Sequence, residues 1–274
     1  MIRPQCVELI FRKDWLEMRR NWQVLFPLVV VPIVFAVMLP LIAVAPTLPL
    51  PAQVPSAGLL NMMKAFPSNL RNEIAEMNGQ QAIIYMISLY LFAPVFLIIP
   101  IMASSVIASD SFAGEKERRT IEALLATPLS DSEMLLGKML VSFAPATIIT
   151  AASFLIYSAV VDSLTTGIFN GRLLLPNLTW LLLIFGLAPA LAFADIGLTV
   201  IISARVKGVK EAQQISALLL VPLVAAVLGQ ASGAMILDPS LLALLTALLA
   251  LIDGGIFYAS VRAFGRDKIL MHLT

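Results

Sequence analysis

Long apolar stretches alternate with short polar segments along this chain. A helix needs about 20 mostly apolar residues to cross the hydrocarbon core of a bilayer. Six stretches meet this condition, so the pattern predicts an all-α polytopic membrane protein with six transmembrane helices. The predicted spans are residues 23–44, 82–109, 139–161, 177–203, 215–236 and 241–261.

The composition agrees with a chain that is surrounded largely by lipid. Hydrophobic residues make up 59% of the sequence and charged residues only 13%, about half the charged fraction of a soluble domain, which is roughly 25%. The net charge of +1 indicates no particular partner, and we expect no nucleic-acid binding. The single cysteine, Cys6, and the single histidine, His272, exclude an intrachain disulfide and a His/Cys metal cluster.

Lysine and arginine residues are unevenly distributed between the two sides of the predicted bundle. Fifteen of them lie in the N-terminal segment, the second and fourth connections and the C-terminal segment. The other side holds three, namely Lys64, Arg71 and Arg172. Because cytoplasmic loops carry the excess of positive charge, we expect both termini in the cytoplasm. The plasma membrane is the expected location.

Two polar segments outside the spans have recognisable patterns. Residues 1–21 carry apolar side chains at helical spacing, including Ile10 and Met18, and many charges, which predicts an amphipathic helix in the plane of the membrane interface. The alternative is a solvated N-terminal helix. Residues 45–81 form a large external loop that begins with a proline-rich run and continues as a short helix.

The connection at residues 110–138 is the most informative polar segment. Glu115 and Arg119 have the spacing of a favourable ion pair on a helix. Further along, Ile121, Leu124 and Leu125 form a short apolar face, and Pro128 ends the helical pattern. Ser130-x-x-Glu133 then predicts a capping box before the third span. The apolar face either folds back on the membrane helices or binds a soluble cytoplasmic subunit.

The same segment carries a resemblance to a known family. The run Gly-Glu-Lys-Glu-Arg-Arg-Thr-Ile-Glu-Ala-Leu-Leu-Ala-Thr-Pro at 114–128, followed by Gly137-Lys138, resembles the signature loop of ABC transporter permeases of the type-2 exporter (ABC-2) class. The six-span layout agrees with this family along nearly the whole chain. Residues 203–214 also resemble its sodium-efflux branch, although less closely. One departure is Arg119, where many members carry glycine.

The resemblance implies a single permease domain over residues 1–274 that works with partners. These are a cytoplasmic ATP-binding subunit, which holds ATP and magnesium, and a second permease copy in a homodimer or heterodimer. The sequence contains no Gly-x-x-x-x-Gly-Lys-[Ser/Thr] loop for ATP. By position, residues 1–21 match the elbow helix of the family and 110–138 its coupling segment. The implied coupling residues are Glu115, Thr120, Ile121, Leu124 and Leu125.

Two acidic residues, Asp195 and Asp253, lie inside predicted spans, where a charged aspartate costs about 2.5–3.5 kcal/mol. With Gln230 they form a candidate ion or substrate site. The alternative interpretation is a structural hydrogen bond between helices by protonated carboxyl groups. Gly229 and Gly233 have the spacing of close helix contacts, and 229–239 is either re-entrant or spanning.

Two functional hypotheses therefore remain open. The first is the membrane subunit of an ATP-driven exporter. The second is a secondary ion-coupled carrier that uses Asp195 and Asp253. A membrane enzyme is not indicated, because the sequence shows no nucleophile–base pair and no set of metal ligands. The scarcity of charge in the spans favours an apolar substrate, whereas the two aspartates favour a cation.

Overall fold

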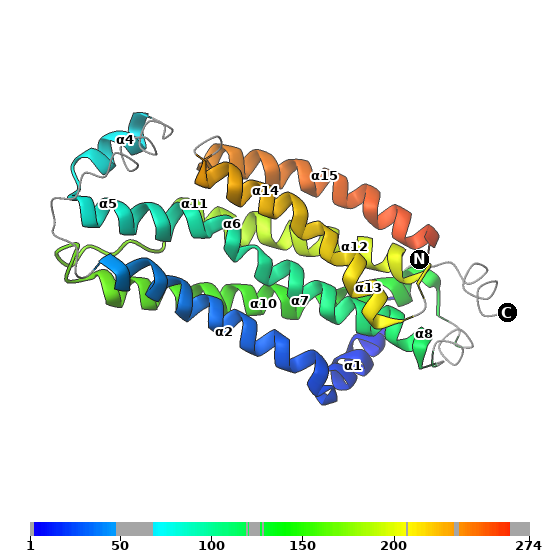
Figure 1. Ribbon diagram of the computed structural model, residues 1–274. Coiled ribbons are helices and arrows are strands. Elements are labelled where there is room, and N and C mark those ends of the chain that lie inside the picture. Colours follow the sequence, from blue (N-terminus) through cyan, green and yellow to red (C-terminus); the bar gives the residue numbers. More distant parts are fainter. Residues whose placement is uncertain are drawn as a thin grey trace.

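The computed structural model describes residues 3–47, 68–118, 120, 127, 129–206, 208–232 and 236–263. Within these ranges the chain is helical and has no strand. Six helical runs are long and apolar enough to span a membrane, which confirms the predicted architecture. They lie side by side, with their axes along the length of the bundle in Figure 1. The spans are Trp22–Thr47, Gly79–Glu117, Asp131–Thr165, Leu178–Ser203, Val209–Ala231 and Pro239–Ala263.

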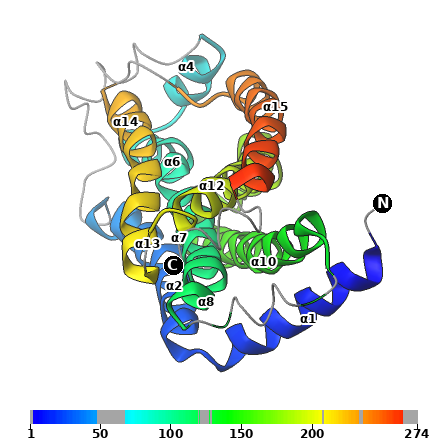
Figure 2. The same cartoon turned by 90° about the vertical axis from the view of Figure 1, so that its right-hand side faces the viewer.

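The first helix, α1 (Pro4–Arg20), confirms the predicted amphipathic segment. It buries Ile10, Asp14 and Met18, which share one helix face at a spacing of four residues. Asn21 separates α1 from α2 (Trp22–Val44) and caps α2 by accepting a hydrogen bond from the backbone of Gln23. Figure 2 shows that α1 lies across one end of the bundle rather than along its axis. We call this the α1 end.

The second span extends further than the hydropathy pattern predicts. It consists of α5 (Gly79–Tyr85), η2 (Met86–Leu91), α6 (Phe92–Phe96), α7 (Ile98–Ser109), η3 (Asp110–Gly114) and α8 (Glu115–Glu117). The span was predicted to end at residue 109 and to be followed by separate helical pieces, whereas the helix continues without a break to Glu117. The helix continues because Phe112, Ala113 and Glu115 are buried against neighbouring helices, so their environment overrides the local polarity of the sequence.

The third span, α10 (Asp131–Thr165), begins at the predicted capping box. Ser130 accepts from the backbone of Glu133, and the Glu133 carboxylate accepts from the backbone of Ser130. The fourth span combines α11 (Leu178–Leu182), η4 (Leu183–Leu187) and α12 (Ala188–Ser203). The short connections η1 (Ala45–Thr47) and α4 (Ser68–Ala75) lie at the opposite end of the bundle, near α5. We call this the α4 end.

The fifth span is shifted along the chain relative to its prediction. It runs through α13 (Val209–Ser216), η5 (Ala217–Leu219) and α14 (Leu220–Ala231). The polar first turns of α13 concealed its helical start from a hydropathy pattern. Its end at Ala231 leaves Ile236 outside the helix, and α15 (Pro239–Ala263) follows as the sixth span. The predicted Gly229–Gly233 contact falls partly outside the described residues.

The apolar core is centred on Trp180 in the half of the bundle towards the α4 end. Its ring stacks on Tyr157 at a centroid distance of 4.9 Å and meets Phe96 edge-on at 5.3 Å. The indole N–H donates to the carbonyl of Leu89, and the Tyr157 hydroxyl donates to that of Ser88. Both carbonyls belong to the π-helical segment η2, whose irregular backbone needs such donors in a dry interior.

Candidate functional site

Four charged side chains meet where α1, α8 and α10 come together at the α1 end. Lys138 Nζ lies 2.8 Å from a Glu115 carboxylate oxygen and 3.0 Å from an Asp14 oxygen. Lys13 Nζ contacts the remaining oxygens of both acids, at 2.5 Å for Glu115 and 3.1 Å for Asp14. Each carboxylate oxygen therefore faces an ammonium group. We call Lys13, Asp14, Glu115 and Lys138 the charged joint.

Three members of the charged joint are almost completely removed from solvent. Lys138 is 0% exposed, Glu115 2% and Asp14 4%. Lys138 also donates to the backbone carbonyl of Ser111, which satisfies a further hydrogen of its ammonium group. A buried charge is tolerated only with partners of this kind, because desolvation of an unpaired ion costs several kcal/mol. The joint therefore locks three chain segments into one arrangement.

The pKa values of Asp14 and Lys13 on α1 are shifted by their partners in the charged joint. Burial alone would raise the pKa of Asp14, but the ammonium groups of Lys138 and Lys13 outweigh it and hold the pKa below its usual range. Partial burial acts to lower the pKa of Lys13, and the carboxylates of Glu115 and Asp14 outweigh it and raise the pKa. Both residues are thus held in their charged forms at neutral pH.

Close packing and a second ion pair secure α1 against α10. A Cβ on Gly137 would lie 2.8 Å from Ile10 Cβ, so the glycine is what allows the two helices to approach. At the start of α1, Arg3 contacts the buried Glu133 carboxylate at 3.0 Å through its side chain and donates to it from its backbone at 2.8 Å. The capping residue of α10 thus also anchors the N-terminus of α1.

Two adjacent residues of α8 hold the turn between α12 and α13. Lys116 Nζ donates to the carbonyl oxygens of Ala204 and Val206, at the C-terminal end of α12. The Glu117 carboxylate accepts from the backbone N–H of Val209, the first residue of α13. A cation at a helix C-terminus and an anion at a helix N-terminus both match the helix dipoles. The last turn of the second span is therefore bonded to the fourth and fifth spans.

A polar cleft opens beside this turn. It has a volume of about 480 Å³ and is lined by residues of the α1–α2 junction, η3, α8 and the start of α13, among them Asn21, Asp110, Arg118 and Lys210. Asp110 accepts from Arg118 at 3.0 Å and from Asn21 at 3.3 Å. The cleft lies between the elbow helix and the fifth span, next to the chain segment that follows α8.

The predicted coupling residues are only partly within the described structure. Glu115 is buried in the charged joint, where it pairs with Lys13 and Lys138, whereas its predicted partner Arg119 lies outside the described residues. Thr120 is exposed, and its backbone N–H donates to the carbonyl of Glu115. The predicted apolar face of Ile121, Leu124 and Leu125 lies outside the described residues.

The second predicted site lies in the middle of the bundle. Asp195 on α12 is completely buried, and its Oδ2 is 2.5 Å from Ser104 Oγ on α7. Asp253 on α15 is 8% exposed, and α15 packs against α12. Gln230 on α14 is 7% exposed, and neither atom of its amide has a partner among the described residues. No hydrogen bond among these residues joins Gln230 to either aspartate.

Sequence reasoning missed Asp14 and Lys138 as functional residues. One available signal was the position of Asp14 between Ile10 and Met18 on the apolar stripe of α1, where a solvated charge is out of place. Lys138 follows a capping box by one turn and a half, so the hydropathy pattern placed it in a loop. The observed α10 begins at Asp131 and carries Lys138 into the bundle.

Comparison with known proteins gives this geometry its context. The sequence matches the family described as ABC-2 family transporter protein over residues 9–259. The chain belongs to the ABC-2 family. The charged joint and the cleft are therefore features of an ABC-2 permease, a multi-pass membrane protein, and the resemblance inferred from residues 114–128 is confirmed.

Part of the chain is also similar in sequence to a named permease. A stretch of 93 residues is 41% identical to the ABC transporter permease protein NatB of Bacillus subtilis, which corresponds to 33% of this chain and 23% of NatB. The matched stretch thus spans about a quarter of that relative. It supports the assignment as a membrane component of an ABC transporter.

Proposed function

We propose that this chain is the transmembrane subunit of an ATP-driven exporter, with ATP and magnesium bound by a separate cytoplasmic subunit. The observation that carries the proposal is the charged joint of this ABC-2 permease, which joins three elements next to the segment that resembles the coupling loop. In this proposal the ATP-binding subunit docks on residues 119–128 and its movement enters the bundle through α8.

The contacts of α8 support such a transmission route. Glu115 connects α8 to α1 and α10, while Lys116 and Glu117 connect it to the ends of α12 and α13. A displacement of α8 cannot leave these neighbours in place, because buried ion pairs and helix-end hydrogen bonds would be broken. Movement of one short helix thus reaches spans two, three, four and five together.

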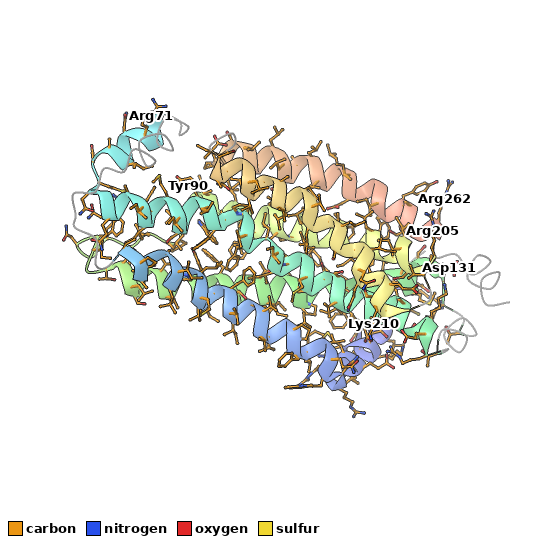
Figure 3. The ribbon with its side chains drawn as sticks, in the orientation of Figure 1. Arg71, Tyr90, Asp131, Arg205, Lys210 and Arg262 are labelled. Atoms are coloured by element: carbon orange, nitrogen blue, oxygen red, sulfur yellow. The ribbon has the colours of Figure 1, made fainter. Side chains whose placement is uncertain are left out.

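The charge distribution supports an orientation with the α1 end in the cytoplasm. Figure 3 shows Asp131, Arg205, Lys210 and Arg262 gathered at this end, with Arg71 at the other. With fifteen of the eighteen basic residues of the sequence on this side, the positive-inside rule favours both termini in the cytoplasm. In this proposal the chain lies in the plasma membrane and the cleft faces the ATP-binding subunit.

A second permease copy completes the proposed transporter. The resemblance implies a pair of six-helix bundles, as a homodimer or a heterodimer, with a substrate path along their interface. Apolar side chains of α2, such as Phe26, Val29 and Ile33, are exposed on the surface of the single chain. In the membrane these side chains contact either lipid or the second copy.

Co-purification with candidate ATP-binding subunits tests the proposal. We expect a stable complex with the wild type that is lost in Leu124→Asp/Leu125→Asp, because two carboxylates would replace the apolar docking face. The matched control is Leu59→Asp/Leu60→Asp, which makes the same change in the predicted external loop and should leave the complex intact. Equal loss in both variants, or no complex with any ATP-binding subunit, would overturn the proposal.

The unpaired polar atoms in the middle of the bundle favour a second candidate function, an ion-coupled carrier that uses Asp195 and Asp253. The two functions differ in their energy source. Flux that is driven by an ion gradient in vesicles containing this chain alone would favour the carrier. Flux that requires both ATP and the co-purified subunit would favour the exporter.

A further inference from the structure

The two contacts of the Ser104 hydroxyl favour a proton on Asp195. Ser104 Oγ lies 2.5 Å from Asp195 Oδ2 and 3.0 Å from the carbonyl oxygen of Ile101. A hydroxyl group has one hydrogen and donates it to a single acceptor in a well-formed bond. Both contacts are hydrogen bonds when Asp195 is a carboxylic acid that donates to Ser104, while Ser104 donates to Ile101.

The surroundings of Asp195 favour a proton over a metal cation as its ligand. Asp195 is 0% exposed, and its other oxygen, Oδ1, has no partner among the described residues. Hard cations are bound in proteins by about six or more oxygen ligands. The described contacts supply Asp195 with one oxygen neighbour from a side chain, Ser104 Oγ, and that atom is already engaged with Ile101.

Hydroxyl groups continue from Asp195 towards the α1 end of the bundle. Thr199 and Ser203 follow Asp195 on one face of α12 at intervals of four residues, or about 6 Å of rise each. Thr199 Oγ1 is 2.8 Å from Ser216 Oγ on α13. All three hydroxyl residues are buried, with Ser203 Oγ unpaired among the described residues.

Spans two and four run in parallel register, because Ser104 meets Asp195 and Lys116 meets Ala204. The hydroxyl groups that follow Asp195 on α12 therefore lie on the same side of it as η3 and α8. We call Asp195, Thr199, Ser203 and Ser216 the polar file. Hydroxyl groups both donate and accept, so with water molecules bridging the steps of about 6 Å along α12 they are able to relay a proton.

Few other ionisable groups lie at the level of Asp195. Helix α7 and η4 hold none. Helix α10, which meets α12 through Phe143 and Phe193, holds none from residue 139 to 156. Lys138 precedes this stretch, at about the level of Thr199, and is paired with Asp14 and Glu115 in the charged joint. On α13, Lys210 and Glu211 lie more than a turn beyond Ser216. On α15, Ile256 faces Gly197 of α12, and Asp253 lies about one turn before Ile256. Asp253 is therefore the acidic residue of α15 nearest to the level of Asp195 among the described residues.

We infer that Asp195 binds a proton in the resting protein and exchanges it with the α1 end of the bundle through the polar file. In this exchange the O–H bond of the Asp195 carboxyl group breaks, its electron pair stays on the carboxylate, and the proton passes to a hydroxyl or water of the file. The inference extends the candidate site at Asp195. It depends on neither the ATP-binding subunit nor the direction of transport.

Infrared spectroscopy of the purified chain in lipid nanodiscs tests whether the proton is present. A protonated carboxyl group has a carbonyl stretch separate from the carboxylate bands. We expect this stretch at pH 7 in the difference spectrum between the wild type and Asp195→Asn, and a shift of its frequency in Ser104→Ala. The control Asp238→Asn, at the half-buried cap of α15, should remove only carboxylate absorption.

The rate at which this band shifts after transfer to D₂O tests the path. Thr199→Val and Ser203→Ala should slow the exchange several-fold, whereas Ser153→Ala, a buried serine on α10 outside the polar file, should leave it unchanged. Absence of the band, or its loss on addition of sodium or potassium at constant pH, would overturn proton binding. Equal exchange rates in all variants would reduce Asp195 to a structural hydrogen bond. Each result is independent of co-purification with an ATP-binding subunit.

Discussion

The charged joint and the polar file are two buried polar regions with opposite bonding. In the charged joint every carboxylate oxygen of Asp14 and Glu115 lies within 3.1 Å of a lysine ammonium group. In the polar file Asp195 Oδ1 and Ser203 Oγ have neither a hydrogen bond nor an ion pair among the described residues. Complete pairing holds segments together, whereas unpaired groups remain available to a ligand. We therefore expect mechanical coupling from the first region and ligand chemistry from the second.

The largest expected effect comes from Lys138→Met in the charged joint. This substitution leaves two buried carboxylates short of a cation and should lower the free energy of unfolding by about 3–5 kcal/mol. Thermal unfolding of the purified chain in detergent measures the loss. Asp195→Asn is the matched comparison in the polar file and should change stability far less, because its amide still donates to Ser104. Equal destabilisation by both substitutions would remove the distinction between the regions.

Further substitutions in Lys138→Met distinguish the loss of ion pairing from a loss of packing. Adding Asp14→Leu and Glu115→Gln to Lys138→Met removes the unpaired charges and should recover most of the lost stability. A triple variant that is as unstable as Lys138→Met alone would show that the lysine acts through its alkyl chain.

The next effect concerns the contact that positions the joint. Gly137→Ala should weaken the packing of α1 on α10 by about 1–3 kcal/mol, because the new Cβ would overlap Ile10. Gly254→Ala is the control, since a Cβ at that position of α15 meets open space. Unfolding temperatures of the two variants measure the difference. A Gly137→Ala protein as stable as the control would mean that α1 does not pack closely in the membrane.

A smaller effect is expected in the pH dependence of stability, to which Asp14 of the charged joint contributes. The pKa of Asp14 is lower in the folded than in the unfolded chain, so the unfolded chain binds the extra proton and stability rises with pH in this window. The contribution is present above the unfolded pKa of about 4 and is lost as the pH falls below it. Unfolding temperatures between pH 3 and 7 should fall more steeply in the wild type than in Asp14→Asn. Parallel curves would contradict the pairing of Asp14.

The smallest expected change in stability comes from the helix-end contacts of α8. Lys116→Met and Glu117→Gln each remove one charge–dipole contact worth about 0.5–1 kcal/mol. If α8 transmits movement, the co-purified complex should still hydrolyse ATP in both variants. Less substrate should be transported for each ATP hydrolysed. Arg205→Gln, which changes a charge in the same turn, serves as the control. Unaltered coupling in both α8 variants would leave the charged joint as the sole transmission route.

The sequence predicted best those features that depend on interactions within a single segment. The apolar face of α1 and the capping box at Ser130 and Glu133 were predicted from spacing alone and are confirmed. The second span was predicted to end at residue 109, whereas its helical run continues to Glu117, because the burial of Glu115 depends on lysines from α1 and α10. Asp195 was identified as a candidate from its position in a span, but its bond to Ser104 depends on the register of α7 against α12.

The sequence by itself determined that this protein is a bundle of six membrane-spanning helices preceded by an amphipathic helix. The reason is that apolar length and internally satisfied backbone hydrogen bonds are properties of each segment alone. Only the tertiary structure decided which charges are paired. Lys138 is separated from Asp14 by 124 positions, and no local pattern relates them. Their contact exists because Gly137 lets α1 approach α10. The close approach removes water from Asp14 and Lys138, and each buried charge then needs the other as a partner.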